Sequence, residues 1–418
     1  MPSVLREAAR WGKRQHLRWR LDRASGERVK WANSDLNWRE FWHKKTQLES
    51  YPRLLQVATN WTCNLKCNFC RLTLDETQDT LKQLPKNELE ISPRVFETVM
   101  ELMPFPETIT LTPLGEPLLY TKLGRILERH REIGSRNLAM TTNANLINDD
   151  RARMIVEGGV NHLFVSIDSS DPEIYASMRV LGQLDKVEAA LERINRWKDR
   201  LNSPRPTMTL ASTFMERNVR QMPDLVDFAV KHKFQTYSVQ LMEMENHDLD
   251  AEFLGHHVPL ARDMVLETLR RAEGKPVDVR IHLAMRNLLT QALSLPERKK
   301  LSAFGEGEAD NFWNGAEPDC VHGSPEGDLQ SLSTHGAHLT EKCHYPWYFM
   351  LIDTDGDVRP CCWASNSFGN LNNYSFEDMW NGEHAITMRE DFLRNHIPKS
   401  CQGKHCRVDL DHNGTLEV

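Results

Sequence analysis

The sequence predicts an α/β protein, a partial, TIM-like (β/α)6 barrel followed by a small cysteine-rich domain. Two observations support this prediction. Between residues 52 and 282, short β-rich runs alternate with amphipathic helical segments. Six such units in series favour a parallel sheet with right-handed crossovers, closed or partly closed as a barrel. From Cys343 onward the composition changes, and clustered cysteines surround a hairpin signal.

The predicted strands are short runs rich in β-branched and apolar residues. They cover residues 54–58, 108–112, 137–141, 162–167, 207–212 and 236–241. The first crossover helix begins at Ser92-Pro93, an N-cap followed by Pro at the first helical position. The other crossover helices cover residues 122–133, 149–157, 184–197 and 219–232. Barrels of this kind place their chemistry at the C-terminal ends of the strands, so the residues after each strand are the candidates for function.

The bulk composition excludes several classes of protein. The 418 residues carry 52 Lys and Arg against 59 Asp and Glu, a net charge of −7 that gives no global nucleic-acid signature. No apolar run approaches the roughly 20 residues of a membrane span, and the N-terminus lacks the apolar core of a secretory signal. Nine cysteines without such a signal indicate a reducing compartment and metal ligation. We therefore expect a cytoplasmic protein with neither a membrane nor nucleic acid as partner.

Four regions are distinguishable along the chain: residues 1–50, 51–282, 283–342 and 343–418. The first carries twelve Lys and Arg, six Asp and Glu, and five of the eleven tryptophans. This basic, Trp-rich extension either grips an acidic substrate, a peptide or a phosphate, or packs its Trp side chains on the barrel with the charges solvated, which we favour. Residues 255–295 indicate linking helices. Residues 304–341 are rich in Gly, Asp, Ser and His and indicate an irregular loop or lid.

Three cysteines lie on one short loop directly after the first predicted strand, in the spacing Cys63-x3-Cys67-x2-Cys70. Three thiolates placed in this way can hold three irons of a cubane 4Fe–4S cluster and leave the fourth iron open to an outside ligand. The alternative is a zinc knuckle. Zinc sites usually pair two such cysteine hooks, and no second hook lies nearby in the sequence.

With Phe69 directly before the last Cys, this motif resembles the signature of the radical S-adenosylmethionine (radical SAM) enzymes. In that family SAM chelates the open iron through its amino and carboxylate groups. One electron from the cluster then cleaves SAM to methionine and a 5′-deoxyadenosyl radical. The resemblance implies the 4Fe–4S cluster, SAM, and a reductant such as flavodoxin or ferredoxin. It also implies that Phe69 packs beside the adenine, although an aromatic here can simply fill the barrel mouth.

The sequence Leu114-Gly115-Glu116-Pro117 follows the second predicted strand and resembles the Gly-Gly-Glu-Pro motif of the family, with Leu114 in place of the first Gly. The resemblance implies that this segment faces the amino group of SAM. An ammonium requires acceptors, and Gly lets the backbone come close. The alternative is a plain turn between a strand and a helix.

The ends of the third and fourth strands also match the family. Thr142-Asn143-Ala144 resembles its Thr-Asn-Gly pattern, which implies that Asn143 lines the SAM pocket. Ser166 and Arg179 resemble the pattern in which a Ser and a downstream Arg meet the ribose or carboxylate of SAM, and the planar fork of Arg suits a carboxylate. The alternatives are a solvated cation for Arg179 and a helix N-cap for Asp168.

The C-terminal region contains Cys343, a hairpin signal at Asp355-Gly356, Cys361-Cys362, and then Cys401-x4-Cys406. It resembles the auxiliary-cluster extension of radical SAM enzymes, known as SPASM in its seven-cysteine form. The shorter one-cluster form, the twitch domain, fits the cysteine number better. It implies a second, auxiliary 4Fe–4S cluster held by ligands Cys343, Cys361, Cys401 and Cys406. Four thiolates can equally hold a structural zinc.

A fully ligated auxiliary cluster cannot bind the substrate, so its expected role is to accept one electron from the substrate radical. We therefore expect a net two-electron oxidation, a dehydrogenation of a small or carbohydrate-like molecule. The alternatives are peptide modification, epimerisation with Cys320 as hydrogen-atom donor, and a non-enzymatic electron-transfer scaffold. Cys320 can also be an ordinary surface thiol. The candidate general bases after the sixth strand, which can equally be a solvated rim, are Glu243, Glu245 and His247.

Overall fold

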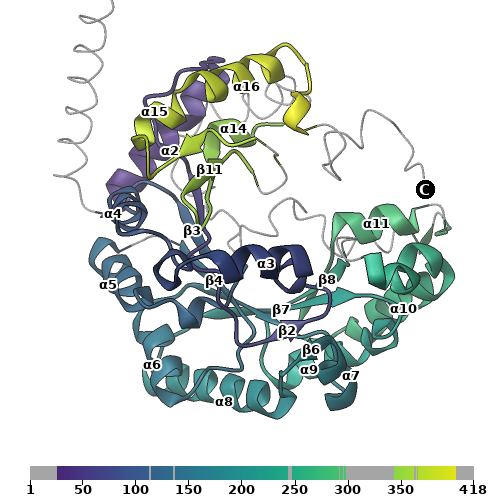
Figure 1. The fold of residues 1–418 in the computed structure, drawn as a ribbon. Coiled ribbons are helices and arrows are strands. Elements are labelled where there is room, and N and C mark those ends of the chain that lie inside the picture. The colour runs from purple at the N-terminus through teal and green to yellow at the C-terminus, as the bar shows by residue number, and fades with distance from the viewer. Residues whose placement is uncertain are drawn as a thin grey trace, which may run out of the picture.

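The computed structural model describes residues 26–112, 114–134, 137–242, 247–290, 292–294, 296–297, 343–361, 364 and 366–401. Its centre is a curved sheet of ten strands in the order β12-β11-β10-β1-β3-β4-β5-β7-β8-β9, with helices along its outer face (Figure 1). A separate pair, β2 (Lys66–Cys67) and β6 (Arg179–Val180), is antiparallel. The predicted α/β fold with a partial barrel is confirmed.

Seven of the ten strands form the barrel, and every neighbouring pair among them is parallel. They are β1 (Leu54–Val57), β3 (Thr108–Leu111), β4 (Asn137–Thr142), β5 (His162–Ser166), β7 (Thr207–Phe214), β8 (Thr236–Leu241) and β9 (Asp278–Ile281). The first six coincide with the predicted strands. The seventh, β9, lies where the sequence indicated linking helices. A run of four residues is too short to be identified as a strand from its sequence alone. The pairing of β9 with β8 decides its conformation.

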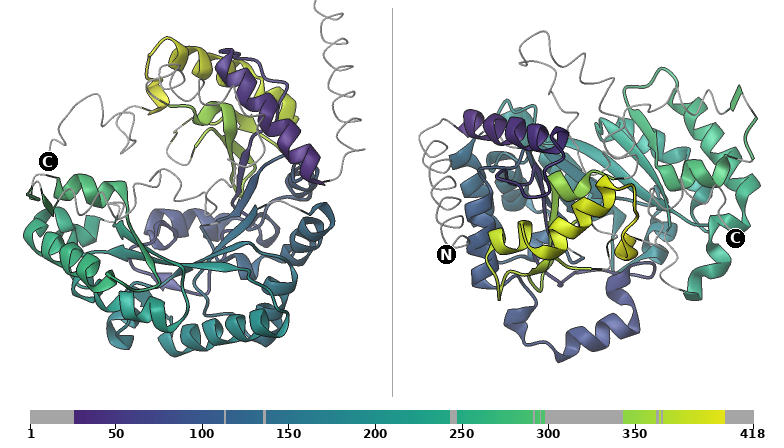
Figure 2. Two further views of the ribbon diagram at one scale, coloured as in Figure 1. Left: turned by 180° about the vertical axis from the view of Figure 1, so that it is seen from behind. Right: turned by 90° about the horizontal axis from the view of Figure 1, so that it is seen from above.

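The helices of the barrel pack on the outer face of the sheet (Figures 1 and 2). Ser92 accepts a hydrogen bond from the Val95 amide and caps α4, as predicted, and Asn148 caps α6 in the same way. Leu55, Ile109 and Leu138 point from alternate strand positions into the core between sheet and helices. The helices are α4 (Pro93–Leu102), α5 (Leu123–Ile133), α6 (Asp149–Glu157), α7 (Pro172–Met178), α8 (Leu184–Arg200), α9 (Asp224–Lys231), α10 (Val258–Ala272) and α11 (Leu283–Leu289).

Shorter helical segments connect these units. Helix α3 (Asp75–Gln83) follows the three-cysteine loop, and its side chains are partly or fully exposed. The short 3-10 turns are η1 (Arg71–Thr73), η2 (Lys86–Glu88), η3 (Pro117–Leu119), η4 (Val219–Gln221), η5 (His247–Glu252), η6 (Leu254–His256) and η9 (Lys399–Cys401). No helix within the described ranges is both long and apolar enough to cross a membrane.

The C-terminal region extends the barrel sheet. Its strand β10 (Phe349–Ile352) is parallel to β1, with Leu54 opposite Phe349 and Val57 opposite Ile352. The hairpin continues to β11 (Asp357–Arg359) and β12 (Gly369–Asn370). Gly356 has a φ of +90°, as the predicted turn requires. The helices of this region are α14 (Tyr345–Tyr348), α15 (Phe376–Trp380) and α16 (Glu383–Leu393).

Helix α2 (Gly26–Trp42) lies beside the C-terminal helices (Figures 1 and 2). Its buried side chains include polar ones that bind backbone groups. Asn37 Nδ2 donates to the Trp347 carbonyl at 2.7 Å, and the Glu40 carboxylate accepts from the amides of Glu49 and Ser50. These buried backbone groups need partners, which explains the polar interface. Of the Trp side chains expected to pack on the barrel, Trp42 packs against the main core, whereas Trp31 and Trp38 are 38% and 40% exposed. Trp11 and Trp19 lie outside the described residues.

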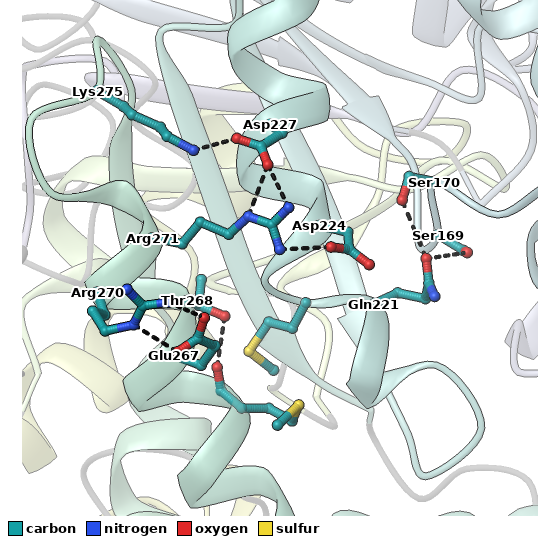
Figure 3. A network of polar contacts seen from close by, with 12 residues as sticks. Ser169, Ser170, Gln221, Asp224, Asp227, Glu267, Thr268, Arg270, Arg271 and Lys275 are labelled. Carbon is teal, nitrogen blue, oxygen red and sulfur yellow. Dashed lines mark hydrogen bonds and ion pairs between the residues drawn. The ribbon is translucent and has the colours of Figure 1, made fainter.

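The last two barrel units are joined at the surface by ion pairs between α9 and α10 (Figure 3). Arg271 Nη1 lies 2.7 Å from Asp224 Oδ1, and its other nitrogens contact Asp227, which also pairs with Lys275. The side chains are about one-third to one-half exposed, so water and salt screen these pairs. They orient α10, whose C-terminal end leads to β9.

Candidate active site

The three-cysteine loop is held in place by the segment at the end of α7. Cys67 lies opposite Arg179 in the antiparallel pair of β2 and β6, and the Asn68 amide donates to the Met178 carbonyl at 3.1 Å. Thr73 Oγ1 lies 2.7 Å from the carbonyl oxygens of both Cys67 and Cys70. These contacts fix the backbone of a loop that has little regular secondary structure of its own.

Nitrogen donors contact two of the three cysteine sulfurs. The Leu65 amide donates to Cys63 Sγ at 3.4 Å, and Asn143 Nδ2 reaches the same sulfur at 3.9 Å. Arg179 Nη1 donates to Cys67 Sγ at 3.9 Å. Donors of this kind stabilise the negative charge of thiolates that bind an iron–sulfur cluster. The residues present therefore fit such a cluster.

Burial favours the protonated form of two of the three thiols. Burial raises the pKa of Cys67 to about 12, and burial also raises the pKa of Cys63. Iron binding therefore has to displace these protons. In the part of the chain that the structure describes, no three His, Cys, Asp or Glu side chains converge as the ligands of one metal ion would. A cubane is bound differently, because each sulfur has its own iron.

Gly115 brings the segment after β3 against the start of the cysteine loop. Its amide donates to the Asn60 carbonyl at 3.2 Å, and the next amide, of Glu116, donates to the Thr62 carbonyl at 2.7 Å. A Cβ atom on Gly115 would lie 2.2 Å from the Thr62 carbonyl oxygen. Only Gly fits at this close approach of two backbones.

The Glu116 side chain is buried and points toward the end of β4. One carboxylate oxygen accepts from Thr142 Oγ1 at 2.7 Å, and the other accepts from the Asn143 amide at 2.9 Å. Burial raises the pKa of Glu116. The carboxylate thus joins the ends of β3 and β4 and orients Asn143. A contact of Glu116 and Pro117 with the SAM amino group stays a prediction.

Asn143 lies between Glu116 and the cysteine loop. Its Nδ2 donates to Asn64 Oδ1 at 2.9 Å, and its Oδ1 accepts from the Asn145 amide at 2.9 Å. The next residue, Ala144, has a φ of +60°. This is the left-handed conformation that favours Gly, which the family pattern has here. The chain thus keeps the backbone conformation despite the substitution.

Arg179 is buried in an ion pair, so the alternative of a solvated cation is wrong. It is 8% exposed, and its Nε lies 2.7 Å from Oδ2 of Asp168, which is fully buried. Asp168 is not a helix cap, because Asp171 caps α7 instead. Ser166 ends β5, pairs with Ala211 and is half-buried. Direct contacts of Ser166 and Arg179 with SAM remain predictions.

The loop after β5 is also anchored on its far side. The hydroxyl groups of Ser169 and Ser170 both donate to Gln221 Oε1, at 3.4 and 3.1 Å (Figure 3). This contact joins the loop that carries Asp168 to η4. The main chain around the ion pair is therefore held from both ends.

Phe69 is half-buried between Arg179 and a group of methionines. Its ring centroid lies 5.5 Å from the Arg179 guanidinium carbon. Phe69 also packs against an apolar cluster that sequence reasoning missed, formed by Met178, Met215, Met242 and Leu249. A signal was present, because Met215 and Met242 each directly follow a strand. Packing of Phe69 beside adenine stays a prediction.

The C-terminal cysteines within the described residues are Cys343, Cys361 and Cys401, and all three are half-buried. Cys343 precedes α14, Cys361 follows β11, and Cys401 ends η9. Cys361 packs against a small apolar cluster that joins β1 and β10. Their role as ligands stays a prediction. The described part of the structure leaves out Cys320, Cys362, Cys406, Glu243, Glu245 and the side chain of His247.

Known protein families match both regions of the chain that contain the cysteine groups. Residues 62–229 match the radical SAM superfamily, and residues 343–407 match SPASM, an iron–sulfur cluster-binding domain. A probable GTP 3′,8-cyclase of Thermoplasma volcanium is 27% identical over 51% of this chain and 62% of its own length. The chain thus spans less than two thirds of that relative. A pre-heme d1 synthase of Dinoroseobacter shibae is 23% identical over 77% of this chain and 71% of its own length.

Solved structures share the fold. Streptococcus suis SuiB bound to S-adenosylmethionine aligns with a TM-score of 0.55 at 15% identity, over 83% of this chain and 69% of its own. Hexahistidine-tagged anSMEcpe with bound AdoMet aligns with a TM-score of 0.53 at 16% identity, over 85% of this chain and 86% of its own. At such identities the likeness concerns the fold alone.

Proposed function

Because this chain belongs to the radical SAM enzymes and carries a C-terminal SPASM-type iron–sulfur domain, we propose that it catalyses the dehydrogenation of a small or carbohydrate-like molecule. The two domains imply a 4Fe–4S cluster, SAM and an auxiliary cluster as cofactors. When bound, they supply a 5′-deoxyadenosyl radical for hydrogen abstraction and a site for the second electron. A flavodoxin or ferredoxin is the proposed reductant.

The observation that carries this proposal is the continuity of the sheet between the two domains. The Ala58 amide donates to the Ile352 carbonyl, and Thr354 Oγ1 donates to the Ala58 carbonyl, both at 2.9 Å. Ala58 lies five residues before Cys63. The strand that leads to the first cysteine group is thus hydrogen-bonded to the strand that lies between Cys343 and Cys361. A fixed spacing of this kind supports electron transfer from a substrate radical to an auxiliary cluster.

The inner face of the barrel supports a polar substrate. Gln56 and Thr110 lie opposite each other on β1 and β3, on the face away from the helices. Gln56 Oε1 and Thr110 Oγ1 are buried and have no hydrogen-bond partner in the described structure. A hydroxyl or amide group of a bound molecule would satisfy them. Other hydroxyl side chains at inner-face strand positions belong to Thr108, Thr141, Ser166, Thr207, Thr209, Thr213, Thr236 and Ser238.

The residues near the proposed reaction have roles that follow from their contacts. Glu116 and Asn143 hold the ends of β3 and β4 against the cysteine loop, and Phe69 in that loop packs against the methionine cluster. The contact of Gly115 with Thr62 keeps the SAM-facing segment and the cysteine loop together. A protein that only transfers electrons would not need the SAM-facing segment held against the cysteine loop. This arrangement therefore favours a catalytic role.

The test is anaerobic incubation of the cluster-loaded full chain with SAM, dithionite and candidate polyols or sugars. We expect 5′-deoxyadenosine together with a product two mass units lighter than the substrate. The same reaction in deuterated water separates the alternatives, because an epimerase gives a product one unit heavier. That heavier product would overturn the dehydrogenase assignment. Absence of 5′-deoxyadenosine from a preparation with full iron content would overturn the radical chemistry itself.

Peptide modification is a second candidate, favoured by one observation on α2. Trp31 and Trp38 expose 38% and 40% of their surfaces, and Lys30 lies over the Trp31 ring. Exposed aromatic side chains beside a basic group suit an acidic peptide. SuiB has been solved bound to its precursor peptide SuiA, but at 14% identity this likeness shows only the fold. Trp31→Ala with Trp38→Ala would weaken peptide binding and leave SAM cleavage without peptide unchanged.

A further inference from the structure

We propose that Arg179 and Asp168 act together to set the electron affinity of the cluster held by Cys63, Cys67 and Cys70. Arg179 favours the reduced cluster, and Asp168 limits this effect. The proposal rests on the cluster that the radical SAM domain implies, and it is independent of the substrate. It gives Arg179 a positioning and electrostatic role that does not depend on the direct SAM contact expected from the sequence.

The position of Arg179 is fixed by its backbone. It lies opposite Cys67 in the β2–β6 pair, which brings its side chain to the sulfur, with 3.9 Å between Nη1 and Sγ. The Gly182 amide donates to the Arg179 carbonyl at 2.6 Å. A Cβ atom on Gly182 would lie 2.7 Å from that carbonyl oxygen and 3.0 Å from the Tyr175 ring. The turn after Arg179 therefore has room only for Gly.

Asp168 is held as firmly as its partner. Its Oδ1 accepts from the Thr213 amide at 2.8 Å, and its carbonyl accepts from Asn218 Nδ2 at 2.8 Å. Asn218 in turn donates to the Thr213 carbonyl at 2.9 Å. The carboxylate thus has one backbone donor and, 2.7 Å from its other oxygen, the guanidinium of Arg179. Tyr175, another polar neighbour of the pair, accepts from Asn145 Nδ2 at 2.9 Å through its hydroxyl.

Arg179 and Asp168 act on the charge that the cluster gains when it takes up one electron. Reduction of the cluster by an external reductant adds one negative charge and leaves the bonds between sulfur and protein intact. A guanidinium that donates to a ligand sulfur stabilises the charge added on reduction. Water screens this effect little, because Arg179 is 8% exposed and Asp168 is fully buried. The carboxylate acts in the opposite direction from a greater distance, since Arg179 lies between it and the sulfur.

Neutralising Asp168 and removing Arg179 therefore shift the midpoint potential of the cluster in opposite directions. Asp168→Asn removes the negative charge while its side-chain oxygen can still accept from the Thr213 amide, so the potential becomes more positive. Removing Arg179 makes it more negative. Arg179→Met alone would leave a buried carboxylate unpaired, so the double variant Arg179→Met with Asp168→Asn is the safer protein. The double variant has a more negative potential than the single Asp168→Asn variant.

The experiment is an anaerobic redox titration of the cluster-loaded full chain, followed by electron paramagnetic resonance and carried out without SAM. The relevant signal is the one missing from a variant with Ala at Cys63, Cys67 and Cys70. Leaving out SAM ensures that any direct contact between Arg179 and SAM does not contribute. Iron content and urea unfolding show whether each variant is folded and loaded.

The matched control is Arg217→Met. Arg217 forms a more exposed ion pair with Glu252 and lies near the end of α7, where its Nη1 reaches the Ser177 carbonyl at 3.5 Å. Among the described residues Arg217 does not contact a cysteine sulfur, so its removal leaves the potential unchanged. Equal potentials for the single Asp168→Asn variant and the double variant would overturn the proposal. A shift of Asp168→Asn in the negative direction would also overturn it.

Discussion

Replacing Gly115 with Ala tests the close approach between the segment after β3 and the cysteine loop. The new Cβ would lie 2.2 Å from the Thr62 carbonyl oxygen and 2.8 Å from the Thr62 amide nitrogen, and both are backbone atoms. Side chains cannot relieve this clash, so the two segments must move apart. Overpacking of this severity costs about 2 kcal/mol. Loss of the hydrogen bond from Glu116 to Thr62 adds about 1 kcal/mol. The folding equilibrium constant falls roughly 100-fold.

The assay is anaerobic urea unfolding followed by tryptophan fluorescence, together with measurement of iron content and SAM binding. We expect a lower unfolding midpoint and weaker SAM binding, because the displaced segment is the one expected to face SAM. The control is Gly124→Ala in α5, where an added Cβ meets no atom within 4 Å. That change stabilises the helix by up to about 1 kcal/mol. Wild-type stability and SAM affinity in the Gly115→Ala protein would refute the reasoning.

Three further predictions concern other parts of the protein. Ala at Cys63, Cys67 and Cys70 abolishes 5′-deoxyadenosine formation and leaves roughly one cluster per chain, measured by iron analysis; loss of all iron would contradict an independent C-terminal site. Burial lowers the pKa of His162 from 6.5 to about 4, so stability is full above pH 6.5 and falls as the pH drops toward 4. Of the stability lost between about pH 7.5 and about pH 5.5, about 1.4 kcal/mol comes from His162, and His162→Gln removes this share in urea titrations; an unchanged slope would disprove it. Asn37→Ala leaves the Trp347 carbonyl unpaired and lowers the stability by about 2 kcal/mol, whereas Trp38→Ala changes it by less; equal losses would contradict the polar interface.

The six strands of the barrel were predictable because each is a compact apolar or β-branched run between clear turn signals. The strand β9 was not, because only four residues form it and their conformation depends on pairing with β8. Ser92, Gly356 and the order of strands and helices behave as local rules require. Local rules did not predict which side chains of α2 are buried, because several of them hydrogen-bond to backbone groups outside the helix.

The candidate site shows the same division. The spacing of Cys63, Cys67 and Cys70 and the Gly115-Glu116-Pro117 segment identified the family from short, contiguous motifs. The motifs did not show that Arg179 pairs with Asp168 and reaches Cys67, because that contact joins three strand ends that are distant in sequence. The methionine cluster beside Phe69 was missed for the same reason.

The sequence by itself determined the parallel α/β architecture and the positions of the two cysteine groups, because these depend on periodicity, turn residues and spacing. The cofactors were implied by the resemblance to the family. The tertiary structure alone decided that β10 joins β1, that α2 packs on the C-terminal helices, and that Arg179 is a buried ion-pair partner. Those features depend on hydrogen bonds between buried polar groups and on an open strand edge, both of which require partners from distant segments of the chain. Local sequence patterns do not show which distant segment supplies the partner.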